Sequence, residues 1–348
     1  MRREGLELKT RFSVSEERKA SVREAEVMMM DNAKKYTLKH IRFTSTDGKT
    51  RVAGYIFEPL CTPRAIVQIS HGMCEYMMRY EQLASELCAR GFLVCGHDHL
   101  GHGNTAPDDE HLGFTVYGGG ADCMVRDLYR MTKLMKRRYG SLPVVLLGHS
   151  MGSFIARRYI SSYGNGLCAA IISGTAGPES PTGMGMLLAK VMMIFKGEKH
   201  RSELLKKISM GSYNKKFKDE DCSESWLSRD GELREKYADD PFCNYTFTVR
   251  GYHDLFELLG SVSGEDWAAS VPTDLPILML SGDKDPVGNY GKGVTKVYKS
   301  LEKAGVKDVT MRLYYGGRHE MFNETNRDDV INDTLEWLEQ YIEKRTDL

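Results

Sequence analysis

The sequence predicts an α/β protein in which a mostly parallel β-sheet is covered by helices on both faces. Short apolar runs bounded by glycine alternate with longer segments of helical period, which is typical of parallel strands joined by right-handed helical crossovers. The runs are apolar almost without interruption, as expected for strands that are buried on both faces. The predicted strands cover residues 65–70, 92–96, 143–147, 169–172, 276–280 and 309–315. The predicted helices cover residues 80–90, 121–138, 151–163, 290–304 and 328–341.

The N-terminal part of the chain has a different pattern. Residues 1–36 are highly charged and lack a sustained apolar period, so we expect them to form an extension outside the core. Residues 38–43 and 52–57 are then predicted to be two strands, because Asp47 and Gly48 between them are typical of a tight turn.

The strand–helix rhythm stops between residues 172 and 276. This gap holds an apolar helix candidate at 184–195, a charged stretch at 196–240 and an aromatic segment at 241–247. An insertion of this size between two core strands predicts a mainly helical cap over the functional site. The predicted domains are a charged extension (1–36), a first core part (37–176), the cap (177–270) and a second core part (271–348).

The helix candidate at 184–195 has three interpretations. It can belong to the core of the cap, line a tunnel for an acyl chain, or dock on lipid as an amphipathic helix. Core packing is the commonest outcome for such a stripe, while its methionines also suit a surface that accepts flexible chains. The cap is therefore the part of the chain expected to make any transient contact with a membrane or micelle.

Composition excludes several classes of function. Lysine plus arginine equal aspartate plus glutamate at 48 each, so the chain has no electrostatic footprint for nucleic acid. The eight cysteines include no C-x-x-C pair, and no apolar segment follows the N-terminal Met1 as in a secretory signal. We therefore expect a soluble protein with reduced cysteines and a cytoplasmic location. The oligomeric state does not follow from the sequence.

One motif carries most of the chemical information. Residues 144–147 are an apolar strand that runs into Gly148-His149-Ser150-Met151-Gly152, and a helical period follows. The bare G-x-S-x-G pattern is weak, since on the order of 0.2 matches arise by chance in a chain of this composition. Its position between a strand and a helix is the context in which such a turn raises a serine hydroxyl as a nucleophile. We therefore interpret Ser150 as a nucleophile.

A serine nucleophile needs a base that is held by an acid, and in this architecture the acid and then the histidine follow the serine along the chain. His319 follows the predicted strand 309–315 and is the only histidine after His253, so it is the expected base. Two aspartates follow the strand 276–280. Asp285 is the favoured acid because Pro286 restricts its backbone to an extended shape, whereas Asp283 fits a turn-forming aspartate.

The same architecture predicts two backbone N–H donors for the oxyanion of a reacting carbonyl. One is the N–H of Met151, directly after the nucleophile. The other is expected after an early strand, where residues 65–70 run into His71-Gly72-Met73 and Met73 is the natural donor.

The segment from His97 to His102 is a candidate metal site, because its three histidines have the spacing of an H-x-H-x-D-H loop. Gly101 stands where the acidic ligand belongs, and suitable downstream ligands are lacking. We therefore expect a polar loop beside the site, and neither a metal nor an organic cofactor.

Together these motifs resemble the monoacylglycerol lipase and lysophospholipase branch of the α/β-hydrolases. The motifs in question are His71-Gly72-Met73-Cys74-Glu75 with Arg79-Tyr80, Asp98-His99-Leu100-Gly101-His102-Gly103, residues 148–152, residues 282–287 and Gly317-Arg318-His319-Glu320. The resemblance covers about residues 37–345. It implies an α/β-hydrolase fold with an inserted cap, and it maps the family's acid onto Asp285 and its second oxyanion donor onto Met73.

What the resemblance implies is an ester hydrolase that needs no cofactor. The expected reaction is serine-dependent cleavage of an apolar acyl ester, such as a monoacylglycerol or lysophospholipid, through an acyl-enzyme on Ser150. Met73 is large where the family commonly has a small residue, and Asn104 stands where the family commonly has a serine. The exact substrate therefore stays open. A ligand-binding protein without catalysis and an acyltransferase that uses the same triad are the alternatives.

Overall fold

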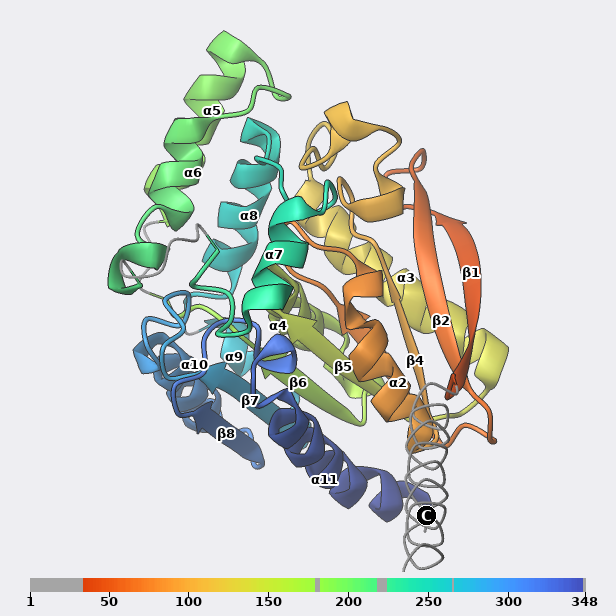
Figure 1. Ribbon diagram of the computed structural model, residues 1–348. Coiled ribbons are helices and arrows are strands. Elements are labelled where there is room, and N and C mark those ends of the chain that lie inside the picture. Colours follow the sequence, from red (N-terminus) through yellow and green to blue (C-terminus); the bar gives the residue numbers. More distant parts are fainter. Residues whose placement is uncertain (1–33, 179–181, 218–223, 265, 347–348) are drawn as a thin grey trace, which may run out of the picture. The chain divides into compact units, whose positions relative to one another are not determined.

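A computed structural model describes residues 34–178, 182–217, 224–264 and 266–346 (Figure 1). Its strands form one sheet in the order β1-β2-β4-β3-β5-β6-β7-β8. β2 pairs antiparallel with β1 and β4, and every other neighbouring pair is parallel. The strands are β1 (Tyr36–Thr44), β2 (Arg51–Pro59), β3 (Ala65–Ser70), β4 (Phe92–His97), β5 (Val144–His149), β6 (Ala169–Ser173), β7 (Ile277–Gly282) and β8 (Val309–Tyr314). The mostly parallel sheet predicted from the apolar runs is confirmed.

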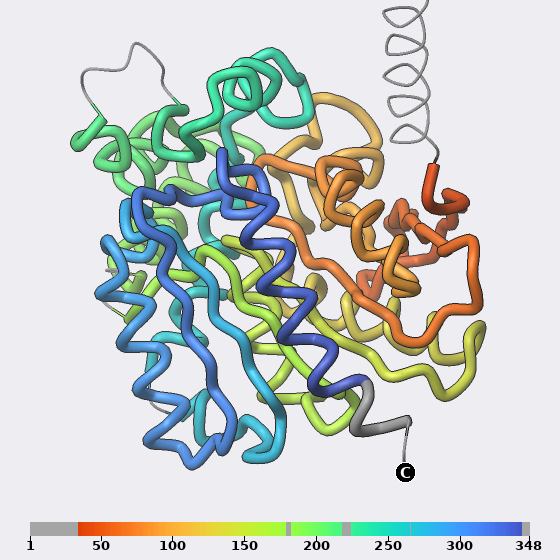
Figure 2. The backbone as a smooth tube through the Cα atoms, turned by 60° about the horizontal axis from the view of Figure 1, so that its bottom comes forward, coloured from red at the N-terminus to blue at the C-terminus, as the bar shows by residue number. Residues whose placement is uncertain are grey.

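Helices cover both faces of the sheet, as predicted. Helices α3, α4 and α10 pack into one apolar cluster, and α2 and α11 pack into the other, on the face that Figure 2 brings forward. The central strand β5 alternates between the two, since Val144 and Leu146 join the first cluster while Val145 and Leu147 join the second. The helices of the core are α2 (Glu81–Ala89), α3 (Gly120–Tyr139), α4 (Met151–Tyr163), α10 (Lys292–Lys303) and α11 (Arg327–Thr346).

The antiparallel pair at the start of the sheet depends on its turn. Asp47 accepts hydrogen bonds through Oδ1 from the backbone N–H groups of Lys49 at 2.7 Å and Thr50 at 2.9 Å, and Gly48 has a φ of 79°. The predicted strand–turn–strand unit is therefore present. Residues 1–33 of the predicted charged extension lie outside the described residues, and Tyr36 already belongs to β1.

The predicted cap region lies between β6 and β7 and is mainly helical in the described residues. It contains α5 (Thr182–Lys196), α6 (Glu203–Met210), α7 (Gly231–Asp239), α8 (Val249–Ser261) and α9 (Asp266–Ala269). The domain boundaries at residues 177 and 270 stay a prediction.

Helix α5 packs one face against the core cluster, through buried Gly185 and Ala189 and through the partly buried side chains Met186, Leu188, Met192 and Met193. Its small residues Gly185 and Ala189 are buried, and a Cβ on Gly185 would lie only 2.7 Å from the ring of Phe256 in α8. The opposite face of α5 carries large apolar side chains that point outward. Met184, Leu187, Val191, Ile194 and Phe195 are all exposed.

Arg157 connects the cap segment to the core through buried hydrogen bonds. This arginine of α4 is 1% exposed and donates hydrogen bonds to the carbonyl oxygens of Ala176, at 2.9 Å, and Val262. Its guanidinium also lies 4.3 Å from the ring centre of Trp267. Burial lowers the pKa of Arg157 to about 9. The side chain of Arg157 is thus hydrogen-bonded both to Ala176, which precedes the cap helices, and to Val262, which follows α8.

Replacing this buried arginine is expected to cost far more than replacing its neighbour. Arg157→Met leaves two buried carbonyl groups without donors and should lower the free energy of unfolding by about 2–5 kcal/mol. Arg158→Met removes only a partly exposed pair with Asp122 and should cost less than about 1 kcal/mol. Urea unfolding of both variants measures the difference, and equal losses would contradict the role given to Arg157.

Candidate active site

Ser150 occupies the turn between β5 and α4. Its backbone has φ 53° and ψ −121°, a conformation that residues with a side chain rarely adopt. Such local strain is typical of functional sites, where the surrounding structure enforces it. The turn places the serine at the carboxyl end of a central strand and at the N-terminus of a helix.

The glycines on either side of Ser150 are required by close packing. A Cβ on Gly152 would lie 2.0 Å from the carbonyl oxygen of Ser70, at the end of β3. A Cβ on Gly148 would lie 2.4 Å from the carbonyl oxygen of Gly152. Helix α4 can therefore start directly against β3 only if both positions lack side chains, which explains the glycine pattern physically.

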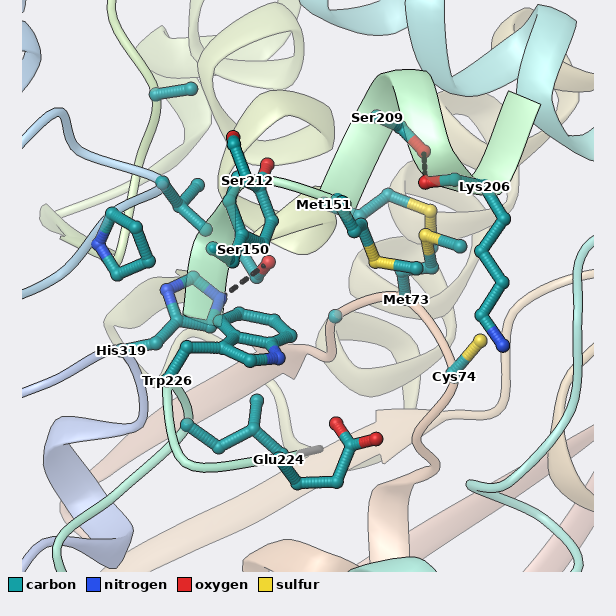
Figure 3. A pocket seen from close by; sticks show the side chains of 18 of the residues that line it. Met73, Cys74, Ser150, Met151, Lys206, Ser209, Ser212, Glu224, Trp226 and His319 are labelled. Atoms are coloured by element: carbon teal, nitrogen blue, oxygen red, sulfur yellow. Dashed lines mark hydrogen bonds between the residues drawn. The ribbon is translucent and has the colours of Figure 1, made fainter. Parts of the chain in front are cut away.

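The structure brings Ser150, His319 and Asp285 together (Figure 3 shows the first two). The Oγ of Ser150 lies 2.8 Å from Nε2 of His319, and Nδ1 of His319 lies 3.0 Å from Oδ2 of Asp285. The three residues follow β5, β8 and β7, so the parallel sheet delivers all of them to one edge. A histidine held in this way can accept the serine proton through Nε2.

The two candidate acids have different surroundings. Asp285 is fully buried, and its Oδ1 accepts a hydrogen bond from the N–H of Val287 at 2.9 Å. Asp283 instead accepts from the N–H of Gly316 at 2.8 Å and pairs with Lys284 at 3.2 Å. The aspartate in contact with His319 is thus Asp285, while Asp283 stabilises the neighbouring loops.

Opposing influences set the protonation of His319. Burial alone lowers its pKa, but the charge and hydrogen bond of Asp285 outweigh burial, with help from Glu320 and Glu75. The net pKa of His319 therefore lies above the ordinary value of 6.5.

The two predicted oxyanion donors belong to segments that border Ser150. Met151 begins α4, and Met73 lies in the loop after β3. A Cβ on Gly72 would lie 3.0 Å from the Cβ of Ser150, so this loop packs directly against Ser150. Both methionine side chains project into the cavity (Figure 3).

A buried ion network links the loop of Met73 to the loop of His319. Arg79 binds Glu320 through two hydrogen bonds of 2.8 Å and Glu75 through one of 2.9 Å. Glu75 also accepts a hydrogen bond from the N–H of Gly72. Burial alone raises the pKa of Glu320, but Arg79 outweighs it and lowers the pKa to about 2. The network thus ties together two of the loops that surround Ser150.

Glu75, Arg79 and Glu320 belong to the sequence motifs, but their role does not follow from the motifs alone. Glu75 and Arg79 stand four positions apart, which is a recognisable helical pair, and Glu320 directly follows the expected base. Their meeting depends on the fold, because Arg79 and Glu320 are 241 residues apart in the chain.

Ser150 opens into a cavity of about 1010 Å³ beneath the cap. Apolar side chains of the core and the cap line one part of it, among them Phe154, Leu255 and Phe256. Glu75 and Glu320 add carboxylates to the wall beside Ser150 and His319. The site therefore combines a large apolar space with a polar wall next to Ser150.

The histidines weighed as metal ligands are buried in the core beneath this site. His97, His99 and His102 are each at most 1% exposed, and burial lowers the pKa of His97 to about 3. Among the described residues, the side chains whose ligand atoms converge as in a metal site are His253, Asp254 and Glu257 in α8. Asp254 there already binds Thr115, and these residues do not line the cavity.

Comparison with known proteins assigns the chain to a family. Residues 62–326 match the family model described as serine aminopeptidase, S33. The chain belongs to this family. Human monoglyceride lipase is 30% identical to it over 307 residues, which are 87% of this chain and 89% of that relative. The monoacylglycerol lipase of Mycolicibacterium smegmatis is 27% identical over 85% of this chain and 95% of its own length.

Solved structures agree with the fold. A thermostable carboxyl esterase from Bacillus coagulans, in complex with glycerol, is 31% identical with a TM-score of 0.83, covering 88% of this chain and 99% of that one. The predicted α/β-hydrolase fold and the resemblance to the monoacylglycerol lipase branch are thus confirmed. This S33 family member is a serine ester hydrolase of the α/β-hydrolase type.

The environment of His319 leads to an expected pH dependence. The neutral imidazole is needed to accept a proton, so kcat/KM should fall as the pH drops through a pKa above 6.5. Asp285→Asn removes the main influence that raises this pKa and should lower kcat by about 10⁴-fold, whereas Asp283→Asn should change kcat less than about tenfold. A pH–rate profile of the three proteins checks this, and a larger loss for Asp283→Asn would exchange the two assignments.

Proposed function

We propose that this protein cleaves carboxylic esters with a long apolar acyl chain through an acyl-enzyme on Ser150. The observation that carries the proposal is the continuous hydrogen-bonded path from Ser150 Oγ to His319, at 2.8 Å, and on to Asp285, at 3.0 Å. This geometry fits a nucleophile, a general base and an acid that orients the base.

In the proposed reaction, Ser150 attacks the ester carbonyl while His319 takes its proton through Nε2. Asp285 holds the imidazole in the required tautomer and stabilises its protonated form. The backbone N–H groups of Met73 and Met151 stabilise the oxyanion, and each donor contributes about 2.7–4 kcal/mol in comparable sites. His319 then protonates the departing alcohol, and a water molecule repeats the sequence on the acyl-enzyme.

We propose a monoacylglycerol as the substrate class. The apolar part of the cavity suits an acyl chain, and the carboxylates of Glu75 and Glu320 beside Ser150 suit the hydroxyl groups of an uncharged alcohol. Arg79 is already bound to both carboxylates, and the lysines of the cavity, among them Lys206 and Lys216, belong to the cap, so the wall beside Ser150 and His319 favours glycerol over a phosphate-bearing headgroup. Relatives named monoglyceride lipase support the same choice.

We further propose that the cap contacts lipid through α5. The exposed side chains of α5 continue into Leu204 and Ile208 of α6, which are 53% and 49% exposed, and lysines such as Lys190 and Lys196 flank them. An apolar patch bordered by cations is typical of a helix that lies in a membrane interface. In the described part of the chain, no helix combines the length and apolar character needed to cross a bilayer.

A reducing compartment such as the cytoplasm remains our proposal for the location. In the described residues, Cys61, Cys74, Cys88, Cys95, Cys123, Cys168 and Cys243 form no disulfide, and unpaired cysteines of this kind are usual in a reducing compartment.

Hydrolysis assays test the reaction and the headgroup together. The wild type should release fatty acid from monooleoylglycerol at least about tenfold faster than from lysophosphatidic acid, because the phosphate meets the carboxylates of Glu75 and Glu320. Ser150→Ala should lower kcat by about 10⁶-fold without changing the urea midpoint. Activity retained in Ser150→Ala would exclude the proposed nucleophile, and a preference for the phosphate ester would exclude the proposed headgroup.

Vesicle assays test the lipid contact of the cap. The triple variant Leu187→Gln, Ile194→Gln and Phe195→Gln should hydrolyse vesicle-bound monooleoylglycerol at least about tenfold more slowly, because it loses apolar area for insertion. Its activity on soluble p-nitrophenyl butyrate should stay within about twofold.

The matched control replaces exposed apolar residues elsewhere, namely Leu60→Gln, Tyr117→Gln and Tyr315→Gln. This control should retain vesicle activity. Equal losses in the two triple variants would contradict a specific role for α5.

A further inference from the structure

The imidazole of His319 packs against two other rings. His149 lies with its ring centre 4.8 Å away at an interplanar angle of 47°, and Trp226 lies at 5.0 Å and 37°. Figure 3 shows the indole of Trp226 next to His319, with Ser150 beyond the imidazole. Trp226 comes from the charged stretch of the cap at residues 196–240.

These two rings respond differently when His319 becomes charged. Burial lowers the pKa of His149 to about 3, so His149 stays neutral and contributes an aromatic contact without charge. Indole is the best partner for a cation among aromatic side chains, and the attraction strengthens where water is excluded. His319 is only 2% exposed, so a positive charge on its ring is largely screened from water.

The cap backbone holds Trp226 in this position. The N–H of Trp226 donates to Oδ1 of Asn214 at 3.0 Å, and the ring of Tyr213 packs against the indole with centres 4.9 Å apart. The N–H of Glu320 donates to the carbonyl oxygen of Leu227 at 2.8 Å. The segment that carries Trp226 is therefore hydrogen-bonded to the segment that carries His319.

Buried Glu324 adds a second connection between these two segments. Its Oε1 accepts hydrogen bonds from the N–H of Arg318 at 2.9 Å and from the N–H of Arg229 at 3.1 Å. Ser228 also donates to the carbonyl oxygen of Asn323 at 2.8 Å. These hydrogen bonds join the segment that carries Trp226 to the segment that carries His319. They therefore hold the indole in place beside the imidazole.

We propose that Trp226 is a positioning residue for His319: its indole holds the imidazole in line with Ser150 and stabilises the imidazolium formed when Ser150 transfers its proton. This inference rests on the proposed roles of Ser150 and His319. The contact with indole exists before the reaction, but it becomes stronger only when the ring is charged. It therefore lowers the barrier and does not merely tighten substrate binding.

The variants Trp226→Phe and Trp226→Leu separate this role from simple packing. Both keep an apolar side chain in the cavity wall, but only phenylalanine keeps an aromatic face. We expect Trp226→Leu to lower kcat by about 2- to 30-fold with KM within about twofold, and Trp226→Phe to retain most of kcat. Trp267→Phe, which changes a buried tryptophan that does not line the cavity, is the control and should leave kcat unchanged.

An NMR titration of His319 supplies a readout that needs no substrate. Its resonance is identified by its loss in His319→Gln, and its other charged neighbours Asp285, Glu320 and Glu75 are the same in every variant. The pKa of His319 should be lower in Trp226→Leu than in the wild type by about 0.3–1.5 pH units, and nearly unchanged in Trp226→Phe.

Two results would overturn the proposal. One is an unchanged pKa of His319 in Trp226→Leu, and the other is an equal loss of kcat in the phenylalanine and leucine variants. If the wild type cleaves none of the esters tested, the proposed function fails, while the titration still decides whether Trp226 stabilises the charged imidazole.

Discussion

The two hydrogen bonds of the His319 imidazole constrain most of the site. The Oγ of Ser150 lies 2.8 Å from one ring nitrogen and the Oδ2 of Asp285 lies 3.0 Å from the other. The loops after β5, β7 and β8 must therefore meet around the imidazole. A parallel sheet satisfies this requirement because it delivers all its carboxyl ends to one edge. The strained backbone of Ser150 and the bare glycines beside it follow from the same demand, since α4 must begin directly against β3.

Much of this arrangement could be predicted from the sequence, because it depends on local patterns. Apolar runs and helical periods located the strands and core helices, and the order of Ser150, Asp285 and His319 followed from the strands that precede them. The choice between Asp283 and Asp285 could be argued from Pro286, although only the structure shows which carboxylate contacts the imidazole. The catalytic roles themselves remain proposals.

The parts that could not be predicted depend on contacts between distant segments. Arg79 meets Glu320 across 241 residues, and Trp226 lies in a charged stretch without a helical period to indicate which residues turn inward. Helix α5 shows the reverse problem. Its apolar content was evident, but its orientation depends on Gly185 and Ala189, which lie on the packed face and leave large apolar side chains exposed on the opposite face. The cap therefore has one segment bonded to the histidine loop and another that presents apolar side chains to its surroundings.

The account depends most on Ser150 being an activated nucleophile, and active-site labelling tests this claim most directly. The protein would be treated with a fluorophosphonate, digested and mapped by mass spectrometry, with His319→Gln treated in parallel. We expect one covalent adduct, on Ser150, which forms much more slowly in the variant because the hydroxyl loses its base. An adduct on another residue, no adduct, or equal labelling of the variant would contradict the account.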